Sequence, residues 1–298
     1  MSDTDLARRI IDTVNATYGR HPATRAVHAK GILCSGTFTP TTAAAAVSRA
    51  QHFNDGPLAS HVRFSNAGGN PDASDANRDG RGMAVKITLP DGTRTDVLGS
   101  TSPVFPVRTP DDFAVLTEAR PDPEKLQAFI AAHPESHAAL GFGATFGVPA
   151  SFARLQFHSI HAYRFVAADG TAIHARYHFV PDAGEAFLSD DEATEADPDF
   201  LRAELAERFT RGPVRFAIEL ELAQPGDPVD DPTAVWPEGR PRVHVADLAI
   251  GTFASDRERD GDILVFDPTR VVDGIECTDD PILRFRPTVY NESVTRRT

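Results

Sequence analysis

The sequence predicts an α+β fold, in which one antiparallel, barrel-like β-sheet carries inserted and flanking α-helices. Three observations lead to this class. Many short segments alternate in hydrophobicity or are rich in β-branched residues, the turns Asp91-Gly92 and Asp169-Gly170 join such segments as hairpins, and helical segments interrupt them without a regular strand–helix–strand order. No internal repeat or linker divides the 298 residues, so we expect a single domain over residues 1–298.

The N-terminal part is expected to begin with an amphipathic helix over residues 5–18, because its apolar residues recur on one helical face. A second, short helix is expected over residues 42–51, after the break at Thr39-Pro40. Four strands are predicted in this part, over residues 30–38, 62–65, 82–88 and 95–98.

The rest of the chain is predicted to be mostly helical over residues 110–137, with helix caps at Asp111 and Asp122. An acidic helical segment is expected over residues 191–208. Four further strands are predicted, over residues 158–167, 172–180, 215–222 and 262–266.

Charge and composition exclude several functional classes. The chain has 30 basic and 43 acidic residues, a formal charge of −13, and no basic stripe, which argues against a nucleic-acid partner. No apolar run approaches the length of a membrane span, and the first thirty residues lack the apolar core of a secretory signal. Cys34 and Cys277 are therefore expected to be reduced, and the cytoplasm is the expected location.

Four histidines of the second hairpin form one candidate metal site: His158, His161, His174 and His178. His174 and His178 have the same parity along a strand, so they lie on one face, and the hairpin brings the other two nearby. Inward-facing histidines of a barrel can bind Zn²⁺ or iron. The competing interpretation is that they are half-buried and satisfied by backbone carbonyls, and no carboxylate completes a facial triad.

A second candidate site combines the two ends of the chain. Arg286 and Tyr290 lie four residues apart, on one face of a predicted C-terminal helix. A guanidinium against a phenol oxygen favours the phenolate, which is a hard ligand for ferric iron, and tyrosine is a known axial haem ligand. His28 lies just before a predicted strand, where a single histidine is usually structural.

Besides these residues, an ordered series of motifs spans nearly the whole chain, from about His21 to Arg297. They are Arg25-Ala-Val-His28-Ala-Lys-Gly31, Val62-Arg63-Phe64-Ser65, Arg78-Asp79-Gly80-Arg81-Gly82-Met83-Ala84-Val85-Lys86, Gly99-Ser-Thr101-Ser-Pro103-Val-Phe105, Val235-Trp236-Pro237, Phe266-Asp267-Pro268, Gly274-Ile275-Glu276 and Arg286-Pro-Thr-Val-Tyr290. In content and order they resemble the haem catalase superfamily, specifically its short catalase-related peroxidase branch. The resemblance implies a catalase-like antiparallel β-barrel.

The resemblance also implies the catalytic roles. His28 corresponds to the distal histidine, and Ser65 to the serine that orients its imidazole. Tyr290 matches the proximal iron ligand, with Arg286 as its partner. Thr101 stands where the family has a distal asparagine; its hydroxyl can donate one hydrogen bond but lacks the fixed donors of an amide.

The remaining haem contacts follow from the same resemblance. Arg25, Arg63 and Arg297 match the arginines that hold the haem propionates, and Val27 and Phe113 match apolar residues of the distal side. The implied cofactor is haem b. The chain has neither the long N-terminal arm nor the C-terminal regions of full-length catalases, so we expect no NADPH site and a monomer or homodimer.

The implied function is a haem peroxidase that reduces hydrogen peroxide or organic hydroperoxides with small organic electron donors. Because Thr101 replaces the asparagine, we expect weak catalase activity at most. Three alternatives remain: a true catalase that disproportionates hydrogen peroxide, a non-haem metal enzyme that uses the strand histidines, and a haem or lipid carrier without turnover.

Overall fold

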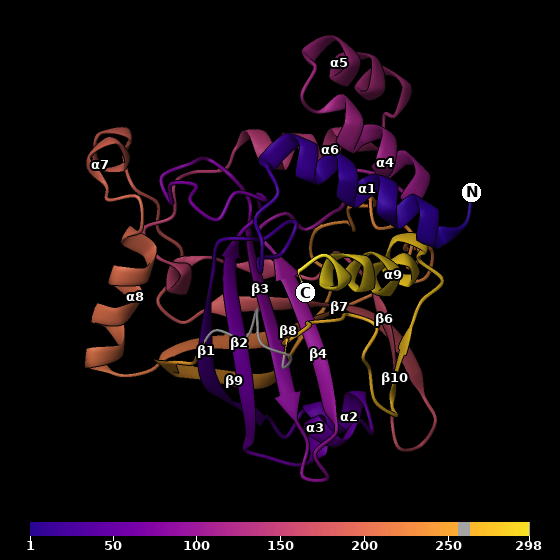
Figure 1. Ribbon diagram of the computed structural model, residues 1–298. Helices are drawn as coiled ribbons and strands as arrows, with labels where there is room; N and C mark the ends of the chain where they lie inside the picture. The colour runs from indigo at the N-terminus through magenta and orange to yellow at the C-terminus, as the bar shows by residue number, and fades with distance from the viewer. Residues whose placement is uncertain (256–262, 298) are drawn as a thin grey trace.

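Eight antiparallel strands close into a barrel in the computed structural model, which describes residues 1–255 and 263–297 (Figure 1). Their order is β7-β5-β4-β3-β2-β1-β9-β8, and pairing of β8 with β7 closes the circle. The strands are β1 Gly31–Pro40, β2 Leu58–Asn66, β3 Arg81–Thr88, β4 Arg94–Ser100, β5 Phe157–His158, β7 Ala172–Pro181, β8 Val214–Leu222 and β9 Arg242–Phe253. Two short strands, β6 Tyr163–Val166 and β10 Ile275–Cys277, extend the sheet beside β7.

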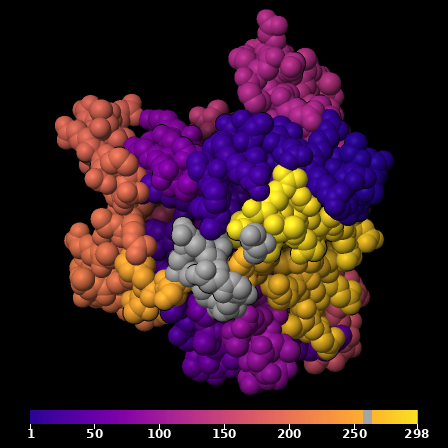
Figure 2. Space-filling view, in the orientation of Figure 1, coloured from indigo at the N-terminus to yellow at the C-terminus, as the bar shows by residue number. Residues whose placement is uncertain are grey.

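Helices cover one side of this barrel. Helix α1 (Asp3–Tyr18) packs against α4 (Pro110–Ala119) and α9 (Pro281–Thr295) through Leu6, Ile10, Val14, Ala114 and Phe285. In Figure 2, α1 in indigo and α9 in yellow lie side by side on the surface, although they come from opposite ends of the chain. The other helices are α2 Ala44–Val47, α3 Gln51–Asn54, α5 Pro123–Ala132, α6 Ser136–Ala144, the 3₁₀ helix η1 Phe152–Arg154, α7 Asp190–Glu195 and α8 Phe200–Arg211.

The two faces of the strands have different roles. Large aromatic side chains point into the barrel, where Phe64 stacks on Phe152 and lies beside Phe157 and Phe216. Directly paired residues of neighbouring antiparallel strands share a face. The next positions along the strands therefore place a polar row on the outer face: Ser65, Gly82, Ser100, His158 and His178 are paired in succession.

The predicted fold class is confirmed, and so are both hairpins. β3 and β4 are joined at Gly92, and β6 and β7 at Gly170; both glycines have a φ of 85°. This left-handed conformation favours glycine because it has no Cβ. No helix among the described residues has both the length and the apolar character that a membrane crossing requires.

Several predicted boundaries are wrong. Residues 42–51 do not form one helix but contribute to α2 and α3, and Thr109, not Asp111, caps α4 by accepting the Asp112 N–H. Residues 158–167 are split between β5 and β6. Residues 263–266 form no strand, and Asp262 lies outside the described residues.

Strand β9 was not predicted at all. Its pairings with β1 and β8 both shift register, and Val245 and Ala246 are consecutive buried residues. Such bulges break the two-residue alternation by which a strand is recognised in a sequence.

Candidate functional site

His28 precedes β1 in a left-handed backbone conformation, with a φ of 54°. This conformation is unfavourable for a residue with a Cβ, so surrounding contacts must hold it. The His28 N–H donates to the Ala67 carbonyl (3.2 Å), and the Arg63 guanidinium donates to the His28 carbonyl (2.9 Å). The ring Nδ1 lies 3.0 Å from Ser65 Oγ. Because Nδ1 is engaged in this way, Nε2 is the ring atom left for a ligand.

Gly82 provides the space for this imidazole. It lies on β3 directly opposite Ser65, and a Cβ at Gly82 would be 2.9 Å from the His28 ring and 3.0 Å from Ser65 Oγ. Gly31 has a similar relation to Arg63, whose guanidinium would lie 2.4 Å from an added Cβ. Neither glycine was predicted to have a role in the site. A glycine inside a strand pattern, which indicates a close approach, was the available signal.

The charge state of His28 suits a proton acceptor. Burial, reinforced by the positive charges of Arg63, Arg286 and Arg25, lowers the pKa of His28 to about 3. The imidazole is therefore neutral at physiological pH. His28 also keeps part of its surface accessible.

Tyr290 lies on α9, and the spacing predicted for its partner is confirmed. Arg286 Nη1 donates to the Tyr290 phenol oxygen at 2.9 Å, one helical turn away. Burial alone would lower the pKa of Arg286, but the phenol oxygen of Tyr290 raises it overall, so the guanidinium stays charged. Like His28, both residues keep accessible surface. The Arg286 charge reaches His28, which links the two ends of the chain at one place.

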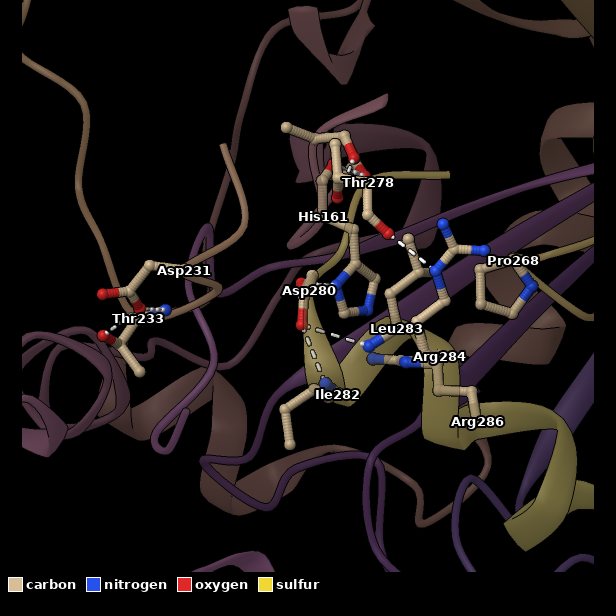
Figure 3. A network of polar contacts seen from close by, with 12 residues as sticks. His161, Asp231, Thr233, Pro268, Thr278, Asp280, Ile282, Leu283, Arg284 and Arg286 are labelled. Atoms are coloured by element: carbon tan, nitrogen blue, oxygen red, sulfur yellow. Dashed lines mark hydrogen bonds and ion pairs between the residues drawn. The ribbon is translucent and has the colours of Figure 1, made fainter. Parts of the chain in front are cut away.

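A buried pair at the start of α9 was not predicted (Figure 3). His161 Nδ1 lies 2.5 Å from an oxygen of Asp280, and the other Asp280 oxygen accepts the N–H groups of Ile282 and Leu283 at the start of α9. Burial and then the charge of Arg286 lower the pKa of His161 to about 4, against the effect of Asp280. The His161 Nε2 is buried without a hydrogen-bond partner among the described residues. The pair fixes the first turn of the helix that carries Tyr290.

The three arginines predicted for the propionates gather around the same region. Arg25 and Arg297 line one small cavity of about 20 Å³, and Arg25 also donates to the Leu264 carbonyl at 2.7 Å. Arg63 is buried, and with Arg25 it contributes to the positive potential at His28. Arg25 is thus common to the cavity that Arg297 lines and to the positive potential that Arg63 adds at His28.

The two apolar residues predicted for the distal side differ in burial. Val27, next to His28, is 40% exposed. Phe113 on α4 is partly buried and lies 5.2 Å from the ring of Phe105, over which the Arg286 guanidinium is placed at 6.0 Å.

Thr101 lies just beyond β4, and its hydroxyl is engaged by backbone. Thr101 Oγ1 accepts the Arg81 N–H at 3.0 Å. Thr101 also lines a cavity of about 140 Å³ whose wall includes His158 and the aromatic rings of Phe142, Phe146 and Phe187. The Thr101 N–H donates to the carbonyl of Arg81, the residue before Gly82. Because Gly82 lies against the His28 ring, this cavity adjoins the His28 side of the barrel.

The strand histidines do not converge on one point. The Nδ1 atoms of His158 and His178 are 2.7 Å apart, and His178 Nε2 contacts Glu221 at 3.2 Å. His174 pairs across the hairpin with Arg164, whereas His161 is held by Asp280. Within the described ranges, these four histidines form no cluster of three ligands. The structure thus brings His158 and His178 together as expected, but not His161 and His174, so the predicted four-histidine metal site does not form.

Comparisons with known proteins decide the family. A family model described as Catalase matches residues 9–298. The chain is 45% identical over 293 residues to a catalase-related peroxidase of Mycolicibacterium paratuberculosis, which covers 97% of this chain and 93% of that protein. The chain belongs to the catalase family. The resemblance predicted from the ordered motifs is thus confirmed.

Two further relatives show how this chain compares in length with other catalase-family proteins. A catalase-related peroxidase of Synechococcus elongatus is 34% identical over 298 residues, covering 97% of this chain and 88% of that protein. Catalase-2 of Bacillus subtilis is 30% identical over 299 residues, covering 90% of this chain but 43% of that longer protein.

Catalase-family proteins generally bind haem, and the residues present fit that group. The donor set contains a phenol oxygen backed by a guanidinium, an imidazole with a free Nε2, and several arginines suited to carboxylates. His28, Arg286 and Tyr290 all keep accessible surface, and Val27 adds exposed apolar surface next to His28.

Proposed function

We propose that this chain is a haem peroxidase that reduces hydrogen peroxide or organic hydroperoxides with small organic electron donors. The observation that carries the proposal is that Arg286, which donates to the Tyr290 phenol, lies close enough to the fixed, neutral His28 for its charge to lower the pKa of that imidazole. The names of the two short relatives, catalase-related peroxidase, support the same assignment. Within residues 1–298 the barrel and its helical cover would act as one haem domain.

In this proposal the Tyr290 phenol oxygen would bind the haem iron, and the Arg286 guanidinium that donates to this oxygen would hold it in place. Arg25, Arg63 and Arg297 pair with the propionates, while Val27 and Phe113 contact the distal face. Haem b fits because the proposed contacts are ionic, apolar and axial. When bound, haem supplies the iron that holds the peroxide and the electrons that cleave its O–O bond.

His28 is the proposed proton shuttle. Its neutral Nε2 would accept the proton of one peroxide oxygen and return it to the other oxygen, which leaves as water from hydrogen peroxide or as an alcohol from an organic hydroperoxide. Ser65 Oγ fixes the ring by engaging Nδ1, so that Nε2 keeps the role of acceptor. General acid–base catalysis of this kind contributes about a hundredfold to ten-thousandfold.

Thr101 supports a peroxidase with weak catalase activity. A catalase must position a second hydrogen peroxide, and the Thr101 hydroxyl, which accepts the Arg81 N–H, offers one donor in place of the two fixed donors of an amide. The aromatic cavity beside Thr101 supports the use of organic donors, since aromatic walls bind flat apolar molecules. The alternative is a true catalase, which several longer relatives are named, and which would need efficient peroxide disproportionation without a donor.

The proposal extends to the nucleotide requirement, the cellular compartment and the oligomeric state. No nicotinamide nucleotide is needed, because the donors are small organic molecules. Free Cys34 and Cys277 are consistent with a reducing cytoplasm. We propose a monomer or homodimer, which size-exclusion chromatography with light scattering would test.

One experiment separates the alternatives. Purified protein is reconstituted with haem, and peroxide is added with and without an oxidisable dye. We expect a Soret band, rapid dye oxidation and slow oxygen release. Rapid oxygen release without dye would instead indicate a true catalase. A Soret band without peroxide consumption would indicate a carrier, and bound Zn²⁺ or iron without a Soret band would indicate a non-haem enzyme.

A further inference from the structure

A three-residue cluster of metal-ligating side chains lies outside the proposed haem site. Asp112 is in the first turn of α4, His133 directly follows α5, and Glu135 directly precedes α6. Each offers one ligand atom, and these atoms all lie within 4.8 Å of one another. Figure 1 shows α4, α5 and α6 grouped at one end of the molecule, so the cluster joins all three.

The side chains are held in place before any ion binds. Thr109 Oγ1 donates to Asp112 Oδ2 at 2.6 Å, and the His133 ring stacks on Phe129 with 4.0 Å between centroids and an interplanar angle of 16°. His133 Nδ1 lies 3.2 Å from a Glu135 carboxylate oxygen. The first residue of α6, the buried Ser136, donates to a backbone carbonyl of the segment before α4 at 2.7 Å. Preorganised ligands lose little conformational entropy when they bind a metal.

The composition of the cluster points to a particular class of ion. One imidazole nitrogen and two carboxylate oxygens suit a divalent transition metal, whereas Ca²⁺ and Mg²⁺ prefer oxygen ligands alone. The side chains of His133 and Glu135 are only 24% and 15% exposed, unlike typical surface acids. With a neutral imidazole, the two carboxylates carry a charge of −2. The nearby Arg108 is mostly exposed and is itself paired with Asp231 at 2.9 Å.

We propose that Asp112, His133 and Glu135 bind one divalent transition-metal ion, best matched by Zn²⁺, with water completing its coordination. The ion would join the start of α4 to the α5–α6 junction. Phe113, the residue after Asp112, packs against Phe105 beside Arg286, so the ion would also fix the outer side of the helical cover over the proposed haem pocket. The site does not depend on the proposed peroxidase function.

The test measures Zn²⁺ binding directly. The purified full chain, with its haem content recorded, is treated with a chelator and dialysed to equilibrium against Zn²⁺; bound zinc is measured by elemental analysis. We expect about one equivalent in the wild type. His133→Ala and the nearly isosteric Glu135→Gln should lose this equivalent, and Asp112→Asn should weaken binding at least tenfold. His137→Ala is the matched control, because it removes an exposed histidine four residues away, and it should bind as the wild type does.

A thermal melt provides the second readout. Zn²⁺ should raise the melting temperature of the wild type and of His137→Ala, but not of Glu135→Gln. Melts without metal show whether each variant is folded. The proposal is overturned if the wild type binds no zinc saturably, or if folded His133→Ala and Glu135→Gln retain the full equivalent. Loss of binding in His137→Ala as well would place the zinc elsewhere and would equally contradict the proposal.

Discussion

The imidazole of His28 occupies the space that a side chain at Gly82 would need, since a Cβ there would lie 2.9 Å from the ring. The two residues are far apart in the sequence. In the sheet, β2 lies between β1, which His28 precedes, and β3, which carries Gly82. The glycine is therefore part of the proposed catalytic geometry although it contributes no chemical group.

Substituting Gly82 tests this relationship. Gly82→Ala should displace the imidazole from Ser65 and lower the rate of peroxide consumption at least tenfold, while haem is still bound. Gly141→Ala is the matched control, because nothing lies within 4 Å of a Cβ at Gly141. Stopped-flow kinetics and the Soret absorbance measure the two properties. Equal rates in the two variants would show that the position of the ring does not depend on Gly82.

Removing the imidazole itself should have a larger effect. His28→Ala should lower peroxide consumption by about a hundredfold to ten-thousandfold, because the proton must then move without a positioned acceptor. Ser65→Ala keeps the imidazole but frees its Nδ1, so a smaller loss is expected. Initial rates at several pH values measure both. Normal turnover by a haem-loaded His28→Ala enzyme would exclude His28 from the mechanism.

Thr101 is expected to set the balance between the two activities. Thr101→Asn restores an amide with fixed donors and should raise the ratio of oxygen release to dye oxidation several-fold. An oxygen electrode and a dye assay on the same sample give this ratio. Thr101→Val, which keeps the shape but removes the hydroxyl, is the control and should not raise it. An unchanged ratio in Thr101→Asn would exclude this residue as the cause of weak catalase activity.

Buried histidines predict the acid stability of the fold. His52 is fully buried beside Phe38 and Phe53, neither ring nitrogen has a hydrogen-bond partner among the described residues, and burial lowers its pKa to about 3. The unfolded chain, with an ordinary histidine pKa of about 6.5, binds the proton first. The free energy of unfolding should therefore fall as pH drops from about 6.5 toward 3.

His52→Leu should remove one proton from this linkage. Between roughly pH 6 and 4, the slope of the unfolding free energy against pH should become shallower by about 1.4 kcal/mol per pH unit. The free energy of unfolding at pH 7.5 should stay the same or rise, because the substitution removes two buried nitrogens without hydrogen-bond partners. Urea titrations across this pH range measure it. His137→Leu, at an exposed position, is the control. Parallel pH curves for the wild type and His52→Leu would show that His52 is not buried in its neutral form.

The sequence predicted what depends on local pattern. The hairpins at Gly92 and Gly170 follow from turn dipeptides, and the Arg286–Tyr290 contact follows from helical spacing. What it could not predict depends on distant partners. The His161–Asp280 pair joins residues 119 positions apart, and β9 is disguised by its register shifts. Neither leaves a periodic signal.

The site shows the same division between local and distant features. His28, Ser65 and Arg63 were predicted from ordered motifs, and the structure brings them into hydrogen-bonding contact. Thr101 was predicted from the same motifs, but the hydrogen bond that its hydroxyl accepts from the Arg81 N–H was not. This hydrogen bond depends on the sheet register beyond β4, which motif spacing does not specify.

The most direct test concerns the bond between Tyr290 and haem iron. Wild-type protein and Tyr290→Phe are titrated with haem, and their ferric absorption spectra are compared; Tyr18→Phe, on α1, is the control. We expect the wild type and Tyr18→Phe to share charge-transfer bands of a phenolate ligand, and Tyr290→Phe to lose these bands and bind haem at least tenfold more weakly. A Tyr290→Phe protein with the wild-type spectrum and haem affinity would contradict the account.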